Sequence, residues 1–237
     1  MKQPVSHPEQ AVISSAIKFQ RALLAACIIL APLSITLYLV SWQGNQRAPF
    51  TPLMVSAMAG STGNTLHFIG AIAASFFLPL GYLGMSLLGM RRAPWLATTS
   101  AALSLVGWIP WAALMGIDAL AYDINQIGRT PQLTALWMHF NGDVVMTIFL
   151  LIYIIGHLLS AVFIGFMPGR LHIIPAWAAW AFALTSPLTI PIILVHNLAA
   201  QNVLKYPVCA LWIIGAIPAT LAMLKNKELA QPAPSPA

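Results

Sequence analysis

Residues 22–42 read ALLAACIILAPLSITLYLVSW, a run without a charged side chain. A helix needs about 20 mostly apolar residues to cross a lipid bilayer. Lys18 and Arg21 come just before the run, as basic residues do in a secretory signal. The apolar core of such a signal, however, has only ~7–15 residues. We therefore interpret residues 22–42 as a retained transmembrane helix.

Five further apolar stretches follow, separated by short segments that contain polar residues, proline or glycine. Hydrophobic residues make up 59% of the 237-residue chain and charged residues only 7%. Because a soluble domain has roughly 25% charged residues, a surface this poor in charge is suited to lipid. We predict an all-α, polytopic integral membrane protein with a bundle of six transmembrane helices. The predicted spans are residues 22–42, 65–90, 95–121, 136–167, 174–197 and 204–224.

Lys and Arg are distributed unevenly between the two sides of this predicted bundle. With the N-terminus inside, only Arg47, Arg129 and Lys205 lie on the outer side. The remaining basic residues lie on the inner side: Lys2, Lys18, Arg21, Arg91, Arg92, Arg170, Lys225 and Lys227. Because cytoplasmic loops carry the excess of Lys and Arg, we predict a cell-membrane protein with both termini in the cytoplasm. Its predicted parts are an N-terminal segment (1–21), one transmembrane domain (22–224) and a disordered tail (225–237).

The net charge of +6 does not indicate nucleic-acid binding, because the basic residues are scattered over the predicted helix ends. An interface for nucleic acid needs a cluster of basic residues along one face. The expected partners are the lipid bilayer and a small-molecule or lipid-like ligand, and no particular protein partner is indicated.

A possible internal repeat relates the second and third predicted helices to the fourth and fifth. A shift of 72 residues places His67-Phe68-Ile69-Gly70 on His139-Phe140-Asn141-Gly142. Ile109-Pro110 and Ile190-Pro191 occupy similar places in the helices that follow. Parallel repeats of this kind tend to hold ligands at their interface. Two apolar hairpins also resemble each other by composition alone, and both interpretations stay open.

Polar and ionisable residues collect at one depth of the predicted bundle, beneath its outer face. Ionisable groups cost at least ~2.5 kcal/mol near the bilayer centre, and they usually face the protein interior and mark function. We therefore predict an outer-facing pocket of histidine, aspartate and asparagine side chains. Its candidates are Asn64, His67, Asp118, His139, Asn141, Asp143, His196, Asn197 and Lys205.

The fourth predicted helix has the best-defined polar face. His139 and Asp143 are four residues apart, and so they meet on one side of a continuous helix. His157 lies about five turns beyond His139 and returns to that side, together with Tyr153. Trp108, Trp111 and Asp118 share one face of the third helix, and we expect the two faces to meet inside the bundle. The buried carboxylate of Asp118 needs a partner such as Lys205 or a histidine.

The fifth predicted helix contains Pro187 and Pro191, which remove backbone donors and free two carbonyl groups within the membrane. One interpretation is an unwound segment that lines a cavity, with Thr189 as a ligand-binding residue. The alternative is a simple kink in which the hydroxyl groups of Ser186 and Thr189 bond to the freed carbonyls.

The first functional hypothesis is a metal site, with a possible enzymatic reaction on a lipid-like substrate. Imidazole and carboxylate groups suit a divalent ion such as zinc, and three protein ligands with one open position suit catalysis. The candidate ligands are His67, His139 and His196. Asp118 or Asp143 would act as a fourth ligand or as a general base. The candidates for contact with a substrate or ligand are Asn64, Asn141, Thr189, Asn197 and Lys205.

Two other hypotheses stay open beside the metal site. In the second, His67 and His139 are axial ligands of a haem, although the Cys-x-x-Cys-His attachment motif is absent from the sequence. In the third, the chain is a small transporter or an accessory subunit of a membrane complex. The double-proline helix favours a transporter, because interrupted helices are typical of carrier sites.

Overall fold

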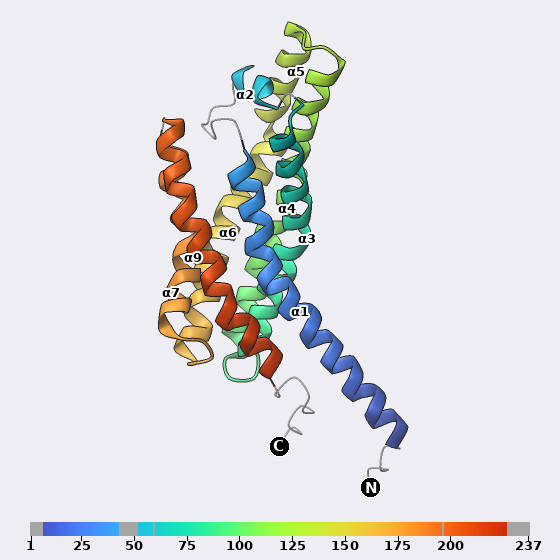
Figure 1. The fold of residues 1–237 in the computed structure, drawn as a ribbon, viewed down its shortest axis with the longest axis vertical. Coiled ribbons are helices and arrows are strands. Elements are labelled where there is room, and N and C mark those ends of the chain that lie inside the picture. Colours follow the sequence, from blue (N-terminus) through green and yellow to red (C-terminus); the bar gives the residue numbers. More distant parts are fainter. Residues whose placement is uncertain (1–6, 43–51, 59, 196, 227–237) are drawn as a thin grey trace.

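The computed structural model describes residues 7–42, 52–58, 60–195 and 197–226, and these residues form helices joined by short turns (Figure 1). No strand occurs within those ranges. The helices are α1 (His7–Ser41), α2 (Pro52–Ala57), α3 (Thr62–Gly89), α4 (Pro94–Ile127), α5 (Pro131–Asn141), α6 (Val144–Arg170), α7 (Ala176–Thr185), α8 (Thr189–Leu194) and α9 (Leu198–Lys225). The prediction of an all-α fold is thereby confirmed.

Five of these helices are long and apolar enough to cross a membrane, namely α1, α3, α4, α6 and α9. Their outer faces carry large apolar side chains such as Phe76, Ile109 and Ile155, each of which is more than half exposed. Water would disfavour so much apolar surface, whereas lipid accommodates it. The chain therefore has the features of a multi-pass membrane protein, and its apolar outer faces suit a lipid bilayer.

The fifth predicted span, 174–197, is interrupted in the structure. Its helical parts are α7 and α8, and the turn Ser186-Pro187-Leu188 separates them. Neither part alone is long enough to cross a bilayer, and together they form one apolar stretch, Ala176–Ile192.

The helix predicted over residues 136–167 is also divided, which corrects the sequence-based expectation. α5 ends at Asn141, and α6 begins at Val144 with Asp143 as its N-cap. The carboxylate of Asp143 accepts a hydrogen bond from the Val145 N–H at 2.7 Å. His139 and Asp143 are therefore not neighbours on one continuous helix face. A short polar residue after glycine is a common helix start, but the apolar content on both sides conceals it.

Glycine residues allow the long helices to approach closely. A Cβ atom on Gly107 of α4 would come within 3.0 Å of the backbone of Gly156 in α6. Gly70 of α3 contacts the backbone of α1 at Tyr38 in the same way, and Gly165 of α6 contacts α7. Small residues at helix contacts are typical of membrane bundles, because without a side chain the two backbones can pack against each other.

The two copies of the proposed repeat motif lie in different surroundings. His67-Phe68-Ile69-Gly70 is within α3, where both His67 and Gly70 are buried against α1. His139-Phe140-Asn141-Gly142 covers the end of α5, and a Cβ atom on Gly142 would meet only ordinary contacts. The similarity of the two motifs in sequence therefore does not extend to equivalent packing.

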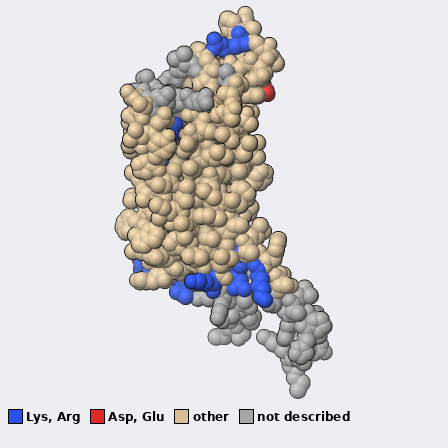
Figure 2. All heavy atoms as spheres, in the orientation of Figure 1, with Lys and Arg blue, Asp and Glu red and all other residues tan. Residues whose placement is uncertain are grey.

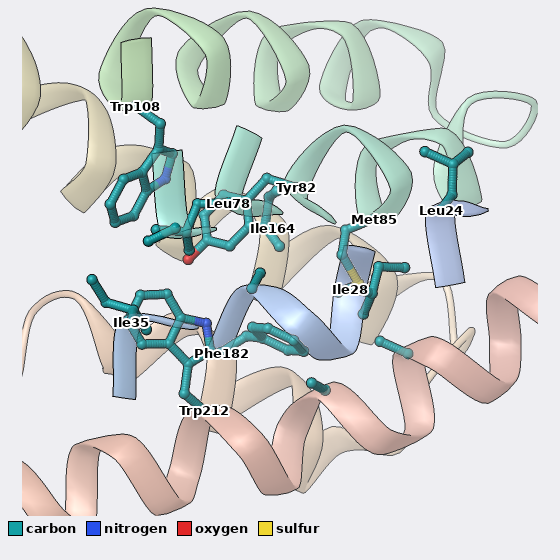
Figure 3. Packing of buried hydrophobic residues seen from close by; sticks show 14 of the residues in the cluster. Leu24, Ile28, Ile35, Leu78, Tyr82, Met85, Trp108, Ile164, Phe182 and Trp212 are labelled. Atoms are coloured by element: carbon teal, nitrogen blue, oxygen red, sulfur yellow. The ribbon is translucent and has the colours of Figure 1, made fainter. Parts of the chain in front are cut away.

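A large apolar core joins α1, α3, α4, α6, α7 and α9. Figure 3 shows Tyr82 of α3 beside Trp108 of α4 and Trp212 of α9, whose ring centroids are themselves 6.3 Å apart. The centroid of the Tyr82 ring is 5.9 Å from that of Trp108 and 6.5 Å from that of Trp212. This aromatic layer closes the bundle on one side of the cavity described below.

Most of the Lys and Arg side chains lie at one end of the bundle. The start of α1 and the end of α9 lie at the same end of the bundle, and most of the visible Lys and Arg side chains gather there (Figures 1 and 2). Arg21 of α1 donates a hydrogen bond to the carbonyl oxygen of Asn226 at 2.8 Å, just after α9. We call this end the basic end of the molecule.

Candidate functional site

A cavity of about 520 Å³ lies between α1, α4, α6, α8 and α9, with Met54 of α2 at its edge. We call it the central cavity. Most of its wall is aliphatic or aromatic, and the polar side chains in the wall are few. The large aromatic residues in the wall are Tyr38, Trp42, Trp108, Trp111, Tyr153 and Trp212.

One wall comes from Ile35, Tyr38 and Leu39 of α1 and from Trp42, which directly follows this helix. These residues are spaced by three, one and three positions, which places them on a single helical face. Gly70 lets α3 approach the backbone of α1 at Tyr38 and so fixes the position of this wall.

The opposite walls come from α4 and α6, and their aromatic residues contact one another. The centroid of the Trp108 ring lies 5.6 Å from that of Tyr153 and 5.6 Å from that of His157. The Trp111 and Tyr153 centroids are 5.3 Å apart. The expectation that the polar faces of the third and fourth predicted spans meet is therefore confirmed for these residues.

His157 is oriented by the backbone of its own helix. Its Nδ1 atom lies 2.7 Å from the carbonyl oxygen of Tyr153. A carbonyl oxygen can only accept a hydrogen bond, and so Nδ1 must carry the proton. The imidazole ring stacks on the Tyr153 ring at 4.3 Å, with 13° between the planes. In the neutral ring Nε2 is then a hydrogen-bond acceptor in the cavity wall.

His67 and Asp118 form the central polar contact of the site. Nδ1 of His67 lies 3.0 Å from the carbonyl oxygen of Tyr38, and Nε2 lies 3.4 Å from Oδ2 of Asp118. The carbonyl requires a proton on Nδ1. Two unprotonated atoms would repel each other at the second contact, and so the pair needs one further proton, on Nε2 or on the carboxyl group. A histidine is thus the partner of Asp118, as one of the two sequence-based alternatives expected.

Aromatic rings enclose the imidazole of His67, whereas Asp118 borders the central cavity. The Tyr38 and Trp42 rings lie 4.1 and 4.7 Å from the His67 ring, centroid to centroid. The His67 side chain is 0% exposed and that of Asp118 is 13% exposed. Only the carboxylate of this pair belongs to the cavity wall.

The break between α7 and α8 borders the central cavity, and its hydroxyl groups do not bond to the freed carbonyls as the kink alternative expected. Ser186 and Thr189 belong to the cavity wall, as an interrupted helix at a ligand site would require. The hydroxyl of Thr189 also donates to the carbonyl oxygen of Ser186 at 2.6 Å, and that of Thr185 to Phe182 at 2.7 Å. These acceptors are not the carbonyls that Pro187 and Pro191 free, which lie four residues before each proline, at Ala183 and Pro187. The Pro187 carbonyl instead accepts a hydrogen bond from the Ile190 N–H at 3.2 Å, within the turn.

Several predicted ligand-binding residues bond to backbone groups at helix ends. The side chain of Asn64 donates to the carbonyl oxygen of Ala57 at 2.9 Å, and that of Asn141 donates to Trp137 at 3.0 Å. Asn197 is the N-cap of α9 and accepts from the N–H of Ala200 at 3.1 Å. None of these three residues, nor the N-cap Asp143, is among the residues that line the cavity. The same residue types that bind ligands are also the best helix caps.

Neither His139 nor Lys205 forms a hydrogen bond or an ion pair with His67 or Asp118 in the part of the chain that the structure describes. His139 is exposed on α5, and His196 lies outside the described residues. Lys205 is 1% exposed and donates to Oδ1 of Asn202 at 3.3 Å. The described residues include no group of three His, Cys, Asp or Glu side chains that could hold a metal ion.

The surroundings of His67 also bear on the metal and haem hypotheses. Both of its ring nitrogens face a partner, the Tyr38 carbonyl and the Asp118 carboxylate. A metal ion needs a free nitrogen lone pair, and so binding at His67 would require one of these contacts to open. The described part of the chain therefore gives neither hypothesis further support.

The contribution of α1 to the site was not predicted from the sequence. Trp42 was interpretable as an interface anchor, and Tyr38 as one more residue of an apolar helix. The available signal was the spacing of Ile35, Tyr38, Leu39 and Trp42 on one face. That signal shows a shared face, but only the packing of distant segments shows that the face borders a cavity.

Comparison of the chain with models of protein families, with curated proteins and with solved structures found no match. The basis for assigning a function is therefore the chemistry of the central cavity. Its size, apolar lining and few polar groups are the general features of a small-molecule site.

Proposed function

We propose that this chain is a membrane-embedded binding protein for a small, mainly apolar, lipid-like molecule, and that the central cavity is its site. The single observation that carries the proposal is a cavity of about 520 Å³ with a largely aromatic and aliphatic wall. Ligand sites for small molecules have volumes of roughly 300–1,000 Å³, and a few placed polar groups orient the ligand. Asp118, His157, Ser186 and Thr189 are such groups here.

The proposed topology has six crossings in the cell membrane, with α7 and α8 together as the fifth. An even number of crossings places both termini on the same side, and the basic end then faces the cytoplasm (Figure 2). Asp118 and Trp42 lie toward the opposite end of their helices. The cavity therefore belongs to the outer half of the bundle. A parallel duplication, which relates the second and third predicted spans to the fourth and fifth, remains part of this proposal.

Transport is a second candidate function, and the break between α7 and α8 favours it. An interrupted helix beside a ligand can rearrange more easily than a continuous one, and such helices form the sites of many carriers. A binding protein that also transports would release its ligand on both sides of the membrane. Uptake into vesicles that contain the purified protein distinguishes the two.

The test fills the cavity with a larger side chain and measures binding of an uncharged apolar dye, N-phenyl-1-naphthylamine. Ile154 lines the cavity, whereas its neighbour Ile155 is exposed to lipid. We expect Ile154→Trp to weaken dye binding about tenfold or more, which corresponds to about 1.4 kcal/mol. Ile155→Trp makes the same substitution on the lipid side of α6, and we expect it to leave binding unchanged.

Bound dye is measured by equilibrium dialysis of the purified protein against the same detergent. Ile154→Phe provides a smaller filling substitution in case the tryptophan disturbs folding, and thermal unfolding verifies all three variants. If folded Ile154 variants bind as much dye as the wild type and Ile155→Trp, the central cavity is not the binding site.

A further inference from the structure

The formal charges on the cavity wall have one sign. Asp118 is the only Asp, Glu, Lys or Arg among the described residues that line the cavity. The proton between His67 and Asp118 makes the pair neutral as a whole, but His67 is 0% exposed and lies behind the carboxyl group. A ligand in the cavity therefore meets the acceptor oxygens of Asp118, and an anionic ligand would find no lysine or arginine in the wall to balance its charge. Burial of an unpaired charge is strongly unfavourable. The wall thus selects against anionic ligands such as fatty acids and phosphates.

One side of the Asp118 carboxylate remains available to a ligand. Oδ2 lies 3.4 Å from Nε2 of His67, which is long for a charge-assisted hydrogen bond. Oδ1 accepts no hydrogen bond from any residue that the structure describes. The side chain is partly exposed, and the surface it presents belongs to the cavity wall.

Aromatic rings surround the same part of the cavity. The Tyr38 and Trp111 centroids are 4.8 Å apart, and Trp111 lies 5.3 Å from Tyr153. The Tyr38 ring also lies 4.1 Å from the His67 ring, centroid to centroid, and Nε2 of His67 faces Asp118. The faces of tryptophan and tyrosine attract cations within about 6 Å of the ring centroid, and aromatic cages bind quaternary ammonium groups in this way.

From the carboxylate and the rings together, we propose that the central cavity takes an organic cation. Its ammonium-type group would lie between Oδ1 of Asp118 and the rings of Tyr38, Trp111 and Tyr153. Its apolar body would fill the remaining space toward Ile154 and Trp212. This inference rests on the proposed function, because it assigns a charge to the ligand of the same cavity.

The test uses two probes of similar size and shape and opposite charge, tetraphenylphosphonium and tetraphenylborate. We expect the wild-type protein to bind the cation about tenfold or more tightly than the anion. Asp118→Asn should reduce binding of the cation about tenfold. Asp123→Asn removes a carboxylate from an exposed position of the same helix, and it should leave the binding of both probes unchanged.

A second variant keeps the test decisive if Asp118→Asn impairs folding. Trp111→Leu retains the carboxylate and removes one ring, and it should weaken binding of tetraphenylphosphonium several-fold. Equal binding of both probes, with no effect of Asp118→Asn or Trp111→Leu on the folded protein, would overturn the inference.

Binding of the uncharged dye distinguishes a wrong charge assignment for the ligand from a wrong assignment of the cavity as a ligand site. If the cavity binds apolar ligands without regard to charge, Ile154→Trp still weakens binding of the dye and of both probes. If the cavity is not a ligand site, Ile154→Trp changes the binding of none of them. Binding of the dye by Asp118→Asn at wild-type affinity would show that the variant retains its fold and its cavity.

Discussion

At the scale of single residues, His67 and Asp118 illustrate how a buried polar pair depends on a fixed backbone. The Tyr38 carbonyl holds Nδ1 of His67, and this contact aims Nε2 at Asp118. Removal of either member would leave the other without its partner in an apolar environment, which is more costly than removal of both. The pair therefore links α1, α3 and α4 at the edge of the cavity.

We predict that His67→Leu destabilises the protein by about 2–4 kcal/mol, because it removes the histidine partner of Asp118 and one of the donors to the Tyr38 carbonyl. His139→Leu changes an exposed residue of the second copy of the motif and should have an effect within about 0.5 kcal/mol. Thermal or denaturant unfolding in detergent provides the comparison. Equal effects of the two substitutions would contradict the role given to His67.

Some contacts of these polar residues could be predicted from the sequence, and others could not. The need of Asp118 for a partner followed from the cost of burying a carboxylate, and a histidine was one of the expected partners. The choice of His67 over Lys205 depended on how α3 and α4 pack, which is not a local property. Asn141 and Asp143 had the same composition as a site, but they bond to backbone at a helix boundary.

At the scale of helices, the contact between α4 and α6 depends on two glycines. Gly107 and Gly156 allow the two backbones to meet, and this close approach brings Trp108 and Trp111 against Tyr153 and His157. A side chain at either glycine would separate the helices. The aromatic wall of the cavity therefore depends on the absence of two Cβ atoms.

We predict that Gly107→Ala destabilises the bundle by about 1–3 kcal/mol, because the added methyl group overlaps the backbone of α6. Gly116→Ala makes the same change in the same helix, at a position with no neighbour within 4 Å. It should be neutral or stabilising by up to about 1 kcal/mol, since alanine has the higher helix propensity. Unfolding measurements on both variants test the contact, and a neutral Gly107→Ala would contradict it.

The sequence predicted the long helices better than it predicted where they begin and end. The long apolar runs predicted α1, α3, α4, α6 and α9, because the membrane requires backbone hydrogen bonds to close within each segment. The prolines predicted a disturbance near residues 186–191, and the structure shows it as the turn between α7 and α8. The boundary at Gly142 was missed, because apolar residues continue on both sides of it.

At the scale of the whole molecule, the main question is whether α7 and α8 together cross the membrane. α7 packs against α6 and α9, and α8 packs against α9. The interruption between them lies at the buried Ser186, where an interrupted backbone is tolerated. With this crossing the basic end carries both termini, and the cavity belongs to the outer half. Without it, the start of α1 and the end of α9 would belong to opposite ends of the bundle, whereas Arg21 of α1 bonds to the Asn226 carbonyl just after α9.

We predict that positions before α7 and after α8 lie on opposite sides of the membrane. His172 precedes α7, Ala199 is in the first turn of α9, and both are exposed. In sealed right-side-out vesicles, an impermeant maleimide should label Ala199→Cys directly and His172→Cys only after permeabilisation. The native Cys27 and Cys209 are buried, and the unmodified chain serves as the background control. Labelling of both positions from the same side would show that α7 and α8 do not cross, and that the bundle has five crossings.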